Sequence, residues 1–121
     1  MKLAVYGTLR NGNKNTGILE NSSLVYPGHN TFPAVIQNQK GSGTVVEVHE
    51  VSEEDLKRYD MYESIDSGLY RRVKTDVKMD DGETESVWVY VAGDELMQRS
   101  NSFRIIQSGD WYNRKVQHNT K

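Results

Sequence analysis

The chain has 121 residues, of which 36 % are hydrophobic and 26 % charged; this excludes a disordered chain and leaves room for one ordinary domain. Its formal net charge of −2 gives no electrostatic reason to expect nucleic acid or an anionic membrane as a partner. The absence of cysteine excludes disulfides, thiolate nucleophiles and cysteine-ligated metal sites. No secretory signal and no run long enough to span a bilayer are found, so we expect a cytoplasmic protein.

The chain opens on an apolar run, residues 3–6, that leads into Gly7, Thr8 and a polar stretch. This pattern is typical of a strand that ends in a loop. Glycine lets a ligand approach the backbone closely, and exposed N–H groups at such a bend can bind a carboxylate or a phosphate. A hairpin with Asn11-Gly12 as its turn explains the same residues.

Further strands are predicted where apolar residues alternate or run together. They cover residues 23–26, 32–37, 43–51, 70–79 and 85–92. In 43–51, Val46 and Val48 lie on one face and Glu47 and His49 on the other. The last strand is apolar on both faces, which is typical of a central strand, and Asp80-Asp81-Gly82 predicts a hairpin turn before it.

One α-helix is predicted from about residue 53 to about residue 62. Ser52 is a good N-cap, and the acidic residues 53–55 favour the positive end of the helix dipole. Residues 16–20 also fit a short helix. Many strands around a helix predict the α+β class, with a small mixed β-barrel flanked by one or two helices. We expect one domain over residues 1–116 and a polar tail over 117–121.

An acidic residue continues the apolar stripe of the predicted helix. Leu56 and Tyr59 mark its inner face, and Glu63 follows on that face. Burial of an unpaired carboxylate costs several kcal/mol or shifts its pKa. Glu63 is therefore either paired with an arginine or placed in a pocket where a raised pKa serves acid/base chemistry. The arginines available for pairing are Arg58, Arg71 and Arg72.

Metal and cofactor motifs are missing from the sequence. The histidines His29, His49 and His118 lack metal-ligand spacing. No Gly-x-Ser-x-Gly elbow, phosphate loop or dinucleotide fingerprint occurs. No metal or cofactor is expected. The aromatic residues are interpreted as core packing and not as a nucleic-acid platform, because basic residues do not alternate with them. They are Tyr59, Tyr62, Tyr70, Trp88 and Tyr90.

Four short motifs follow one another along almost the whole chain. They are Tyr6-Gly7-Thr8-Leu9-Arg10, Asp60-Met61-Tyr62-Glu63, Tyr70-Arg71-Arg72 and Ser108-Gly109-Asp110-Trp111. In this order and at these distances they resemble the γ-glutamylcyclotransferase-like family, and especially its short γ-glutamylamine cyclotransferase branch. The family pattern is Tyr-Gly-[Ser/Thr]-Leu-[Arg/Lys], Leu-Asp-x-x-Glu-Gly, Tyr-x-Arg and often Ser-Gly-Asp-Trp. Tyr59 replaces the usual leucine, and Ser64 replaces the usual glycine.

The resemblance implies an enzyme that closes a γ-glutamyl unit to 5-oxoproline and releases an amine, without a cofactor. Glu63 would be the general acid/base, its pKa raised by Met61, Tyr62 and Tyr70. The implied substrate-binding residues are Tyr6, Gly7, Thr8, Leu9, Tyr70 and Tyr90.

Asn15 and Arg72 are expected to support the structure of the site. The expected partner is a small γ-glutamyl compound. The alternative is a non-catalytic module that binds a small amino compound in the same pocket, because a fold does not imply a function.

Overall fold

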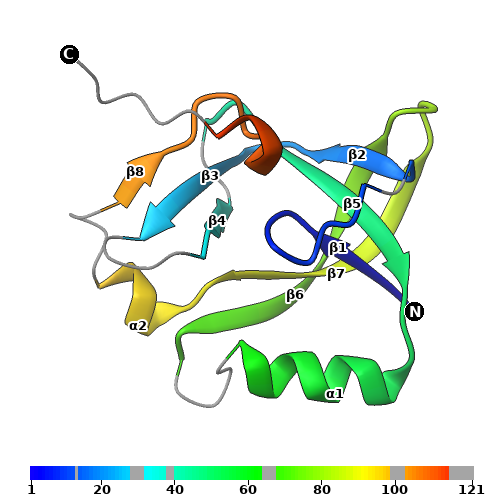
Figure 1. The fold of residues 1–121 in the computed structure, drawn as a ribbon, viewed down its shortest axis with the longest axis horizontal. Coiled ribbons are helices and arrows are strands. Elements are labelled where there is room, and N and C mark those ends of the chain that lie inside the picture. Colours follow the sequence, from blue (N-terminus) through cyan, green and yellow to red (C-terminus); the bar gives the residue numbers. More distant parts are fainter. Residues whose placement is uncertain (13, 28–31, 38–39, 64–67, 99–102, 115–121) are drawn as a thin grey trace.

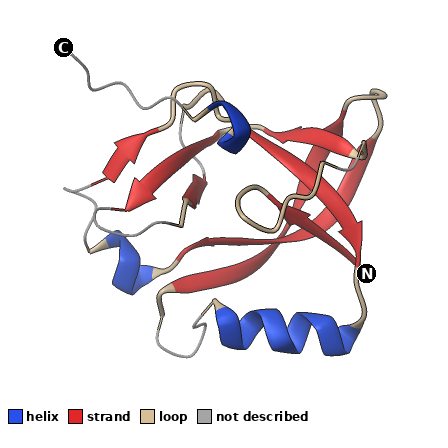
Figure 2. Ribbon diagram, in the orientation of Figure 1, coloured by secondary structure: helices blue, strands red, loops and turns tan. Residues whose placement is uncertain are grey.

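The structure, a computed structural model, describes residues 1–12, 14–27, 32–37, 40–63, 68–98 and 103–114 (Figures 1 and 2). Five strands close into a barrel in the order β1–β5–β2–β6–β7. They are β1 (Lys2–Val5), β2 (Thr16–Leu19), β5 (Thr44–Glu50), β6 (Tyr70–Met79) and β7 (Thr84–Ala92). Neighbouring strands are antiparallel except β1 and β7, whose parallel pairing closes the barrel and makes it mixed.

In the described residues, a second, three-stranded sheet and three helical segments lie around this barrel. The sheet has the order β4–β3–β8, with β3 (Ser22–Pro27), β4 (Ala34–Gln37) and β8 (Phe103–Ile105). The helical segments are α1 (Glu53–Tyr62), α2 (Asp94–Met97) and the 3₁₀ turn η3 (Trp111–Asn113). In Figure 1, α1 lies along one side of the barrel, and the small sheet lies at the opposite end of the view from the N-terminus. The predicted α+β class with a mixed barrel is confirmed.

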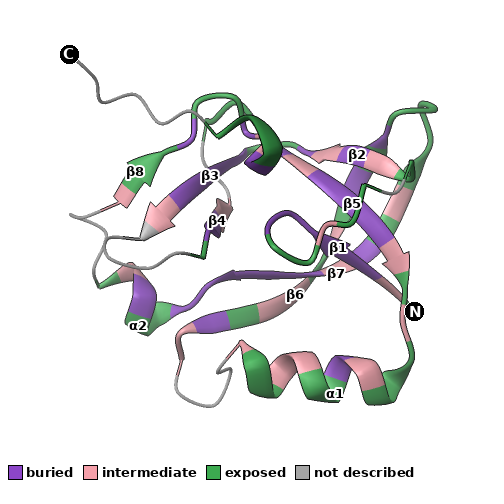
Figure 3. Cartoon of the chain, in the orientation of Figure 1, coloured by how far each residue is buried: buried purple, intermediate pink, exposed green. Residues whose placement is uncertain are grey.

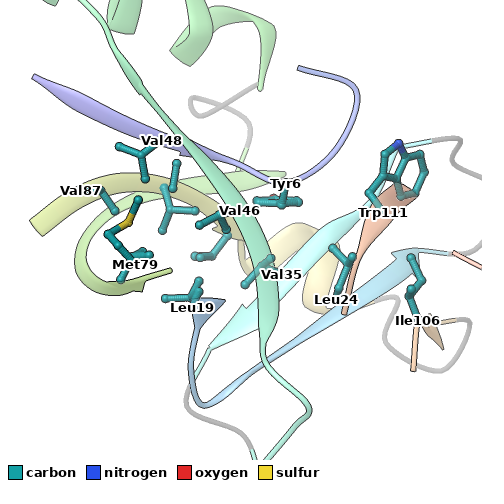
Figure 4. Close-up of a cluster of buried hydrophobic side chains, with 14 residues drawn as sticks. Tyr6, Leu19, Leu24, Val35, Val46, Val48, Met79, Val87, Ile106 and Trp111 are labelled. Atoms are coloured by element: carbon teal, nitrogen blue, oxygen red, sulfur yellow. The ribbon is translucent and has the colours of Figure 1, made fainter. Parts of the chain in front are cut away.

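Strand β7 is buried on both faces, as its sequence predicts. Its odd-numbered valines Val87, Val89 and Val91 belong to the cluster in Figure 4, which fills the barrel and reaches toward η3. Its other face, with Tyr90 and Ala92, belongs to a second cluster that includes Leu56 of α1. Because β7 pairs with both β6 and β1, it has no free edge in the barrel.

Helix α1 begins and ends where its sequence predicts. The Ser52 hydroxyl accepts a hydrogen bond from the Asp55 N–H at 3.0 Å, and the Asp55 carboxylate accepts one from the Ser52 N–H at 3.0 Å. The helix ends at Tyr62, and Glu63 is its C-cap. Leu56 is the one buried residue of the helix, whose other side faces solvent (Figure 3).

The short helix predicted over residues 16–20 is wrong. Thr16–Leu19 is β2, because its backbone pairs with β5 on one side and β6 on the other. This pairing buries Gly17 and Leu19 on alternate positions and overrides a weak helical preference. The hairpin with Asn11-Gly12 as its turn is also wrong, because β5 lies between β1 and β2.

The other predicted strands agree with the structure, with small differences at their ends. The largest difference is in the segment predicted over 32–37, which begins only at Ala34. The predicted tail 117–121 and the family departure at Ser64 lie outside the described residues. Neither α-helix in the described part of the chain has the length and the apolar character needed to cross a membrane.

Truncation of Leu56 tests how firmly α1 is held. Leu56 is 2 % exposed and packs α1 against the barrel. We expect Leu56→Ala to lower the free energy of unfolding by about 2–4 kcal/mol, from lost apolar burial and the cavity left behind. Urea titration measures this loss. Lys57→Ala, on the exposed side of the same helix, is the control and should change stability little.

Candidate active site

A cavity of about 580 Å³ opens between the loop after β1, the end of α1 and strands β6 and β7. Its described lining is Ala4, Val5, Tyr6, Gly7, Thr8, Leu9, Phe32, Pro33, Tyr59, Tyr62, Glu63, Leu69, Tyr70 and Tyr90. The structure thus brings together Glu63 and all six residues predicted to bind substrate. Phe32, Pro33 and Leu69 were not predicted, because no local pattern shows that the segments before β4 and β6 meet the first loop.

Glu63 is half-buried at the end of α1, and it forms no ion pair with a described residue. Two of the three arginines considered as its partners are paired elsewhere: Arg58 with Asp55 and Arg72 with Asp60. Burial raises the pKa of the Glu63 carboxyl above its ordinary value. A carboxyl group in this state exchanges protons closer to neutral pH than an exposed one.

The surroundings of Glu63 differ in part from the expectation. Met61 is 82 % exposed and does not line the pocket, because it lies on the outer side of α1. Tyr62 lines the pocket but is 83 % exposed, so its interpretation as a core residue is wrong. The more deeply buried aromatic neighbour in the pocket is Tyr70, which is 5 % exposed.

Three tyrosine hydroxyls beside the cavity donate hydrogen bonds to protein acceptors. Tyr6 Oη donates to the Tyr90 carbonyl at 2.6 Å, and Tyr70 Oη donates to the Pro33 carbonyl at 2.9 Å. Tyr90 Oη donates to Asp60 Oδ1 at 2.7 Å. Burial raises the pKa of each of these tyrosines, and the nearby Glu63 carboxylate adds to the shift. The three phenols are therefore neutral, and their donors are already used.

Asp60 ties the last turn of α1 to the barrel. Arg72 on β6 donates to it from Nε at 2.8 Å and from Nη2 at 3.0 Å, a bidentate ion pair, and Tyr90 on β7 adds its hydroxyl. Burial raises the pKa of Asp60, but the Arg72 and Tyr90 hydrogen bonds outweigh it and hold this pKa below its ordinary value. Arg72 thus lies where it can brace the turn that carries Glu63.

The loop after β1 is held from behind by a buried carboxylate. Glu47 on β5 is fully buried and accepts hydrogen bonds from Arg10 Nε at 2.9 Å, the Asn11 N–H at 2.9 Å and the Gly12 N–H at 3.1 Å. Burial raises the pKa of Glu47, but these donors outweigh it and lower the pKa to about 2. Glu47 lies on the face of β5 opposite Val46 and Val48, as predicted, but the loop after β1 covers that face. His49 lies on the same face and is half-buried, with its Nε2 atom 3.3 Å from Glu47 Oε1.

Arg10 connects the first motif with the last one. Its Nη1 donates to Asp110 Oδ1 at 2.6 Å, and its guanidinium carbon lies 3.8 Å from the centre of the Tyr112 ring. Farther along the loop, Asn15 Nδ2 donates to the Val48 carbonyl at 3.2 Å, and the Val48 N–H donates to the Asn15 carbonyl at 2.9 Å. Asn15 is therefore bound to β5 and lies behind the loop, outside the pocket lining.

Thr8 and Leu9, on the front of the loop, line the cavity. The N–H groups of Asn11 and Gly12 point back to Glu47, whereas no described residue accepts a hydrogen bond from the N–H of Thr8 or Leu9. Gly7 is buried, and a Cβ there would lie 2.7 Å from Pro33 Cγ. The glycine is thus required for close packing against Pro33, a reason that its sequence context does not reveal.

The described residues contain no group of three or more histidine, cysteine, aspartate or glutamate side chains that could hold a metal ion. The described residues that line the cavity supply one carboxyl group, a threonine hydroxyl, neutral aromatic rings and backbone amides. Such a set can transfer protons and bind an anionic or carbonyl oxygen.

Residues 3–113 match the family Gamma-glutamyl cyclotransferase, AIG2-like, and the chain belongs to this family. A protein of Methanocaldococcus jannaschii named "Putative gamma-glutamylcyclotransferase" is 38 % identical, over 71 % of this chain and 79 % of the relative. An uncharacterized protein of Pyrococcus horikoshii has a similar structure, with a TM-score of 0.63 and 27 % identity over 92 % of this chain and 89 % of the other. An AIG2-like protein of Mus musculus has the same fold, with a TM-score of 0.64 and 23 % identity over 79 % and 81 % of the two chains.

Replacement of Glu47 by glutamine tests the anchoring of the loop through its pH dependence. The folded-state pKa of about 2 lies below the ordinary 4.5, so the ionised Glu47 stabilises the fold above pH 4.5. This stabilisation is lost as the pH falls toward 2. We expect Glu47→Gln to destabilise the protein at pH 6 and the difference from wild type to shrink between pH 4.5 and pH 2. Urea unfolding at a series of pH values measures the difference.

The matched control is Glu50→Gln, on the same strand with a side chain that is 73 % exposed. It should alter stability little at any pH, because exposed ion pairs contribute little. A Glu47 effect that stays constant from pH 6 to pH 2 would contradict this account of the loop.

Proposed function

We propose that the protein is a γ-glutamylamine cyclotransferase in which Glu63 is the general acid/base. The single observation that carries this proposal is the position of Glu63. It is half-buried, without an ion pair to a described residue, in the same cavity as the loop 6–9. Family membership supports the class of reaction.

The proposed reaction is intramolecular. The α-amino nitrogen of a γ-glutamyl unit attacks the γ-carbonyl carbon of the same unit and forms a new C–N bond in a five-membered ring. The bond from that carbon to the leaving amine nitrogen then breaks, which yields 5-oxoproline and a free amine. Nucleophile and electrophile are already tethered, so proximity lowers the barrier and no cofactor or water is consumed.

Glu63 would relay protons from the α-amino nitrogen to the leaving nitrogen. Its carboxylate takes a proton from the α-ammonium group, which frees the nitrogen lone pair for attack. The resulting carboxylic acid then gives this proton to the departing amine, which is a poor leaving group without it. The regenerated carboxylate takes the second proton that the ring nitrogen must lose, and this proton leaves with the released amine as an ammonium group. A raised pKa suits both roles, because a weakly acidic carboxyl group returns its proton more readily.

The loop and the tyrosines would orient the substrate. The N–H groups of Thr8 and Leu9 are the candidates for binding the α-carboxylate or the oxyanion that forms on the γ-carbonyl. The rings of Tyr70 and Tyr90, with Tyr6 behind them, would shape the space around the γ-glutamyl chain. We further propose action on a small γ-glutamyl compound in the cytoplasm, which suits a chain without cysteine.

Replacement of Glu63 by glutamine tests the assignment. Glutamine keeps the size of the side chain but cannot exchange the proton. We expect kcat for 5-oxoproline release from a γ-glutamyl amide to fall at least about 100-fold, within the range of general acid–base catalysis. Chromatographic measurement of 5-oxoproline gives the rate, and circular dichroism shows whether the variant is folded.

Glu54→Gln, in the exposed first turn of α1, is the matched control and should keep wild-type turnover. Turnover of the Glu63 variant within threefold of the wild type would overturn the acid/base role. Wild-type protein that binds γ-glutamyl amides but releases no 5-oxoproline would instead favour the non-catalytic binding module.

A further inference from the structure

Apolar side chains gather at the opening of the pocket. Leu9, Phe32 and Tyr62 line the cavity but are 46 %, 55 % and 83 % exposed. They come from three separate segments: the loop after β1, the stretch before β4, and the last turn of α1. Single exposed apolar residues are common on protein surfaces, but three that converge on one cavity indicate a surface that binds something apolar. We call these three residues the apolar rim.

The charge of the pocket lining also limits which groups can bind at the opening. Glu63 is the one charged side chain among the described residues that line the cavity. A carboxylate bound at the rim would lose water without gaining an ion pair there. It would also be repelled by the ionised Glu63 nearby. The opening therefore favours a group that is both apolar and free of negative charge.

We propose that the apolar rim binds the leaving-amine side of the substrate and selects γ-glutamyl amides of apolar amines over γ-glutamyl amino acids. This inference rests on the proposed function, because the γ-glutamyl half then lies beside Glu63 and its amide substituent points to the opening. An alkyl or aromatic substituent packs on Leu9, Phe32 and Tyr62. The α-carboxylate of an amino-acid leaving group meets no cation among the described lining residues.

Three substrates test the two parts of this proposal separately: the preference for an apolar substituent and the selection against a carboxylate. γ-Glutamyl-methylamide has almost no substituent, γ-glutamyl-phenethylamide adds an apolar ring, and γ-glutamyl-phenylalanine differs from the phenethylamide by one carboxylate. We expect kcat/KM for 5-oxoproline release to be about tenfold higher for the phenethylamide than for the methylamide, from the apolar area buried. The phenylalanine compound should be slower than the phenethylamide.

Rim variants locate the preference. Phe32→Ser and Tyr62→Ser should each bring the ratio of the phenethylamide and methylamide kcat/KM values closer to one. Met61→Ser is the matched control, because Met61 adjoins Tyr62 and is 82 % exposed but lies outside the pocket lining. This control should keep the wild-type ratio. A ratio that drops equally in all three variants, or in none, would overturn the role of the rim.

The outcomes also separate this inference from the proposed function. Conversion of the methylamide at the same or a higher rate than the phenethylamide overturns the rim assignment and leaves the cyclotransferase reaction standing. Faster conversion of the phenylalanine compound than of the phenethylamide overturns the selection against a carboxylate. Conversion of none of the three by folded wild-type protein overturns the proposed function, and with it the assignment of the rim.

Discussion

The buried ion pair between Glu47 and Arg10 fixes the loop after β1, which forms one wall of the pocket. It is formed between a central barrel strand and a loop with little secondary structure of its own, and Asp110 and two backbone N–H groups complete it. A buried carboxylate is costly to leave unpaired, so the loop that satisfies it has one strongly preferred position. The hydrogen bonds of Asn11 and Gly12 point away from the cavity, which leaves the Thr8 and Leu9 side of the loop to face it.

The opposite wall of the pocket has its own anchor. Asp60 binds Arg72 and Tyr90, and Leu56 packs into the second core cluster, so the end of α1 is tied to β6 and β7. Asp60 lies three positions before Glu63 in the chain, and it forms an ion pair with Arg72. Glu63 is thereby left among aromatic rings with a raised pKa, between two walls that are each held by a separate network of charges. Glu47 and Asp60 are paired with arginines, whereas Glu63 forms no ion pair with a described residue, and such a contrast is typical of functional sites.

The main elements could be predicted from the sequence because their signals are local. Alternating valines mark β5 and β7, and Ser52 with its acidic turn marks the start of α1. Residues 16–19 could not be assigned from their own sequence, because β2 is stabilised by pairing with β5 and β6. The burial of Glu47 is equally non-local, since it depends on a loop 35 to 37 positions away in sequence. Most of the candidate site residues came from four motifs in series, whereas Phe32 and Leu69 at the pocket follow only from the assembled structure.

The central claim is that Glu63 is a carboxyl group made less acidic by burial in the pocket. Nuclear magnetic resonance of isotope-labelled glutamate side chains, with the Glu63 signal assigned by its loss in Glu63→Gln, measures its titration directly. The account predicts a Glu63 midpoint above the ordinary 4.5. A Glu63 midpoint at or below 4.5 in the folded protein would contradict the account.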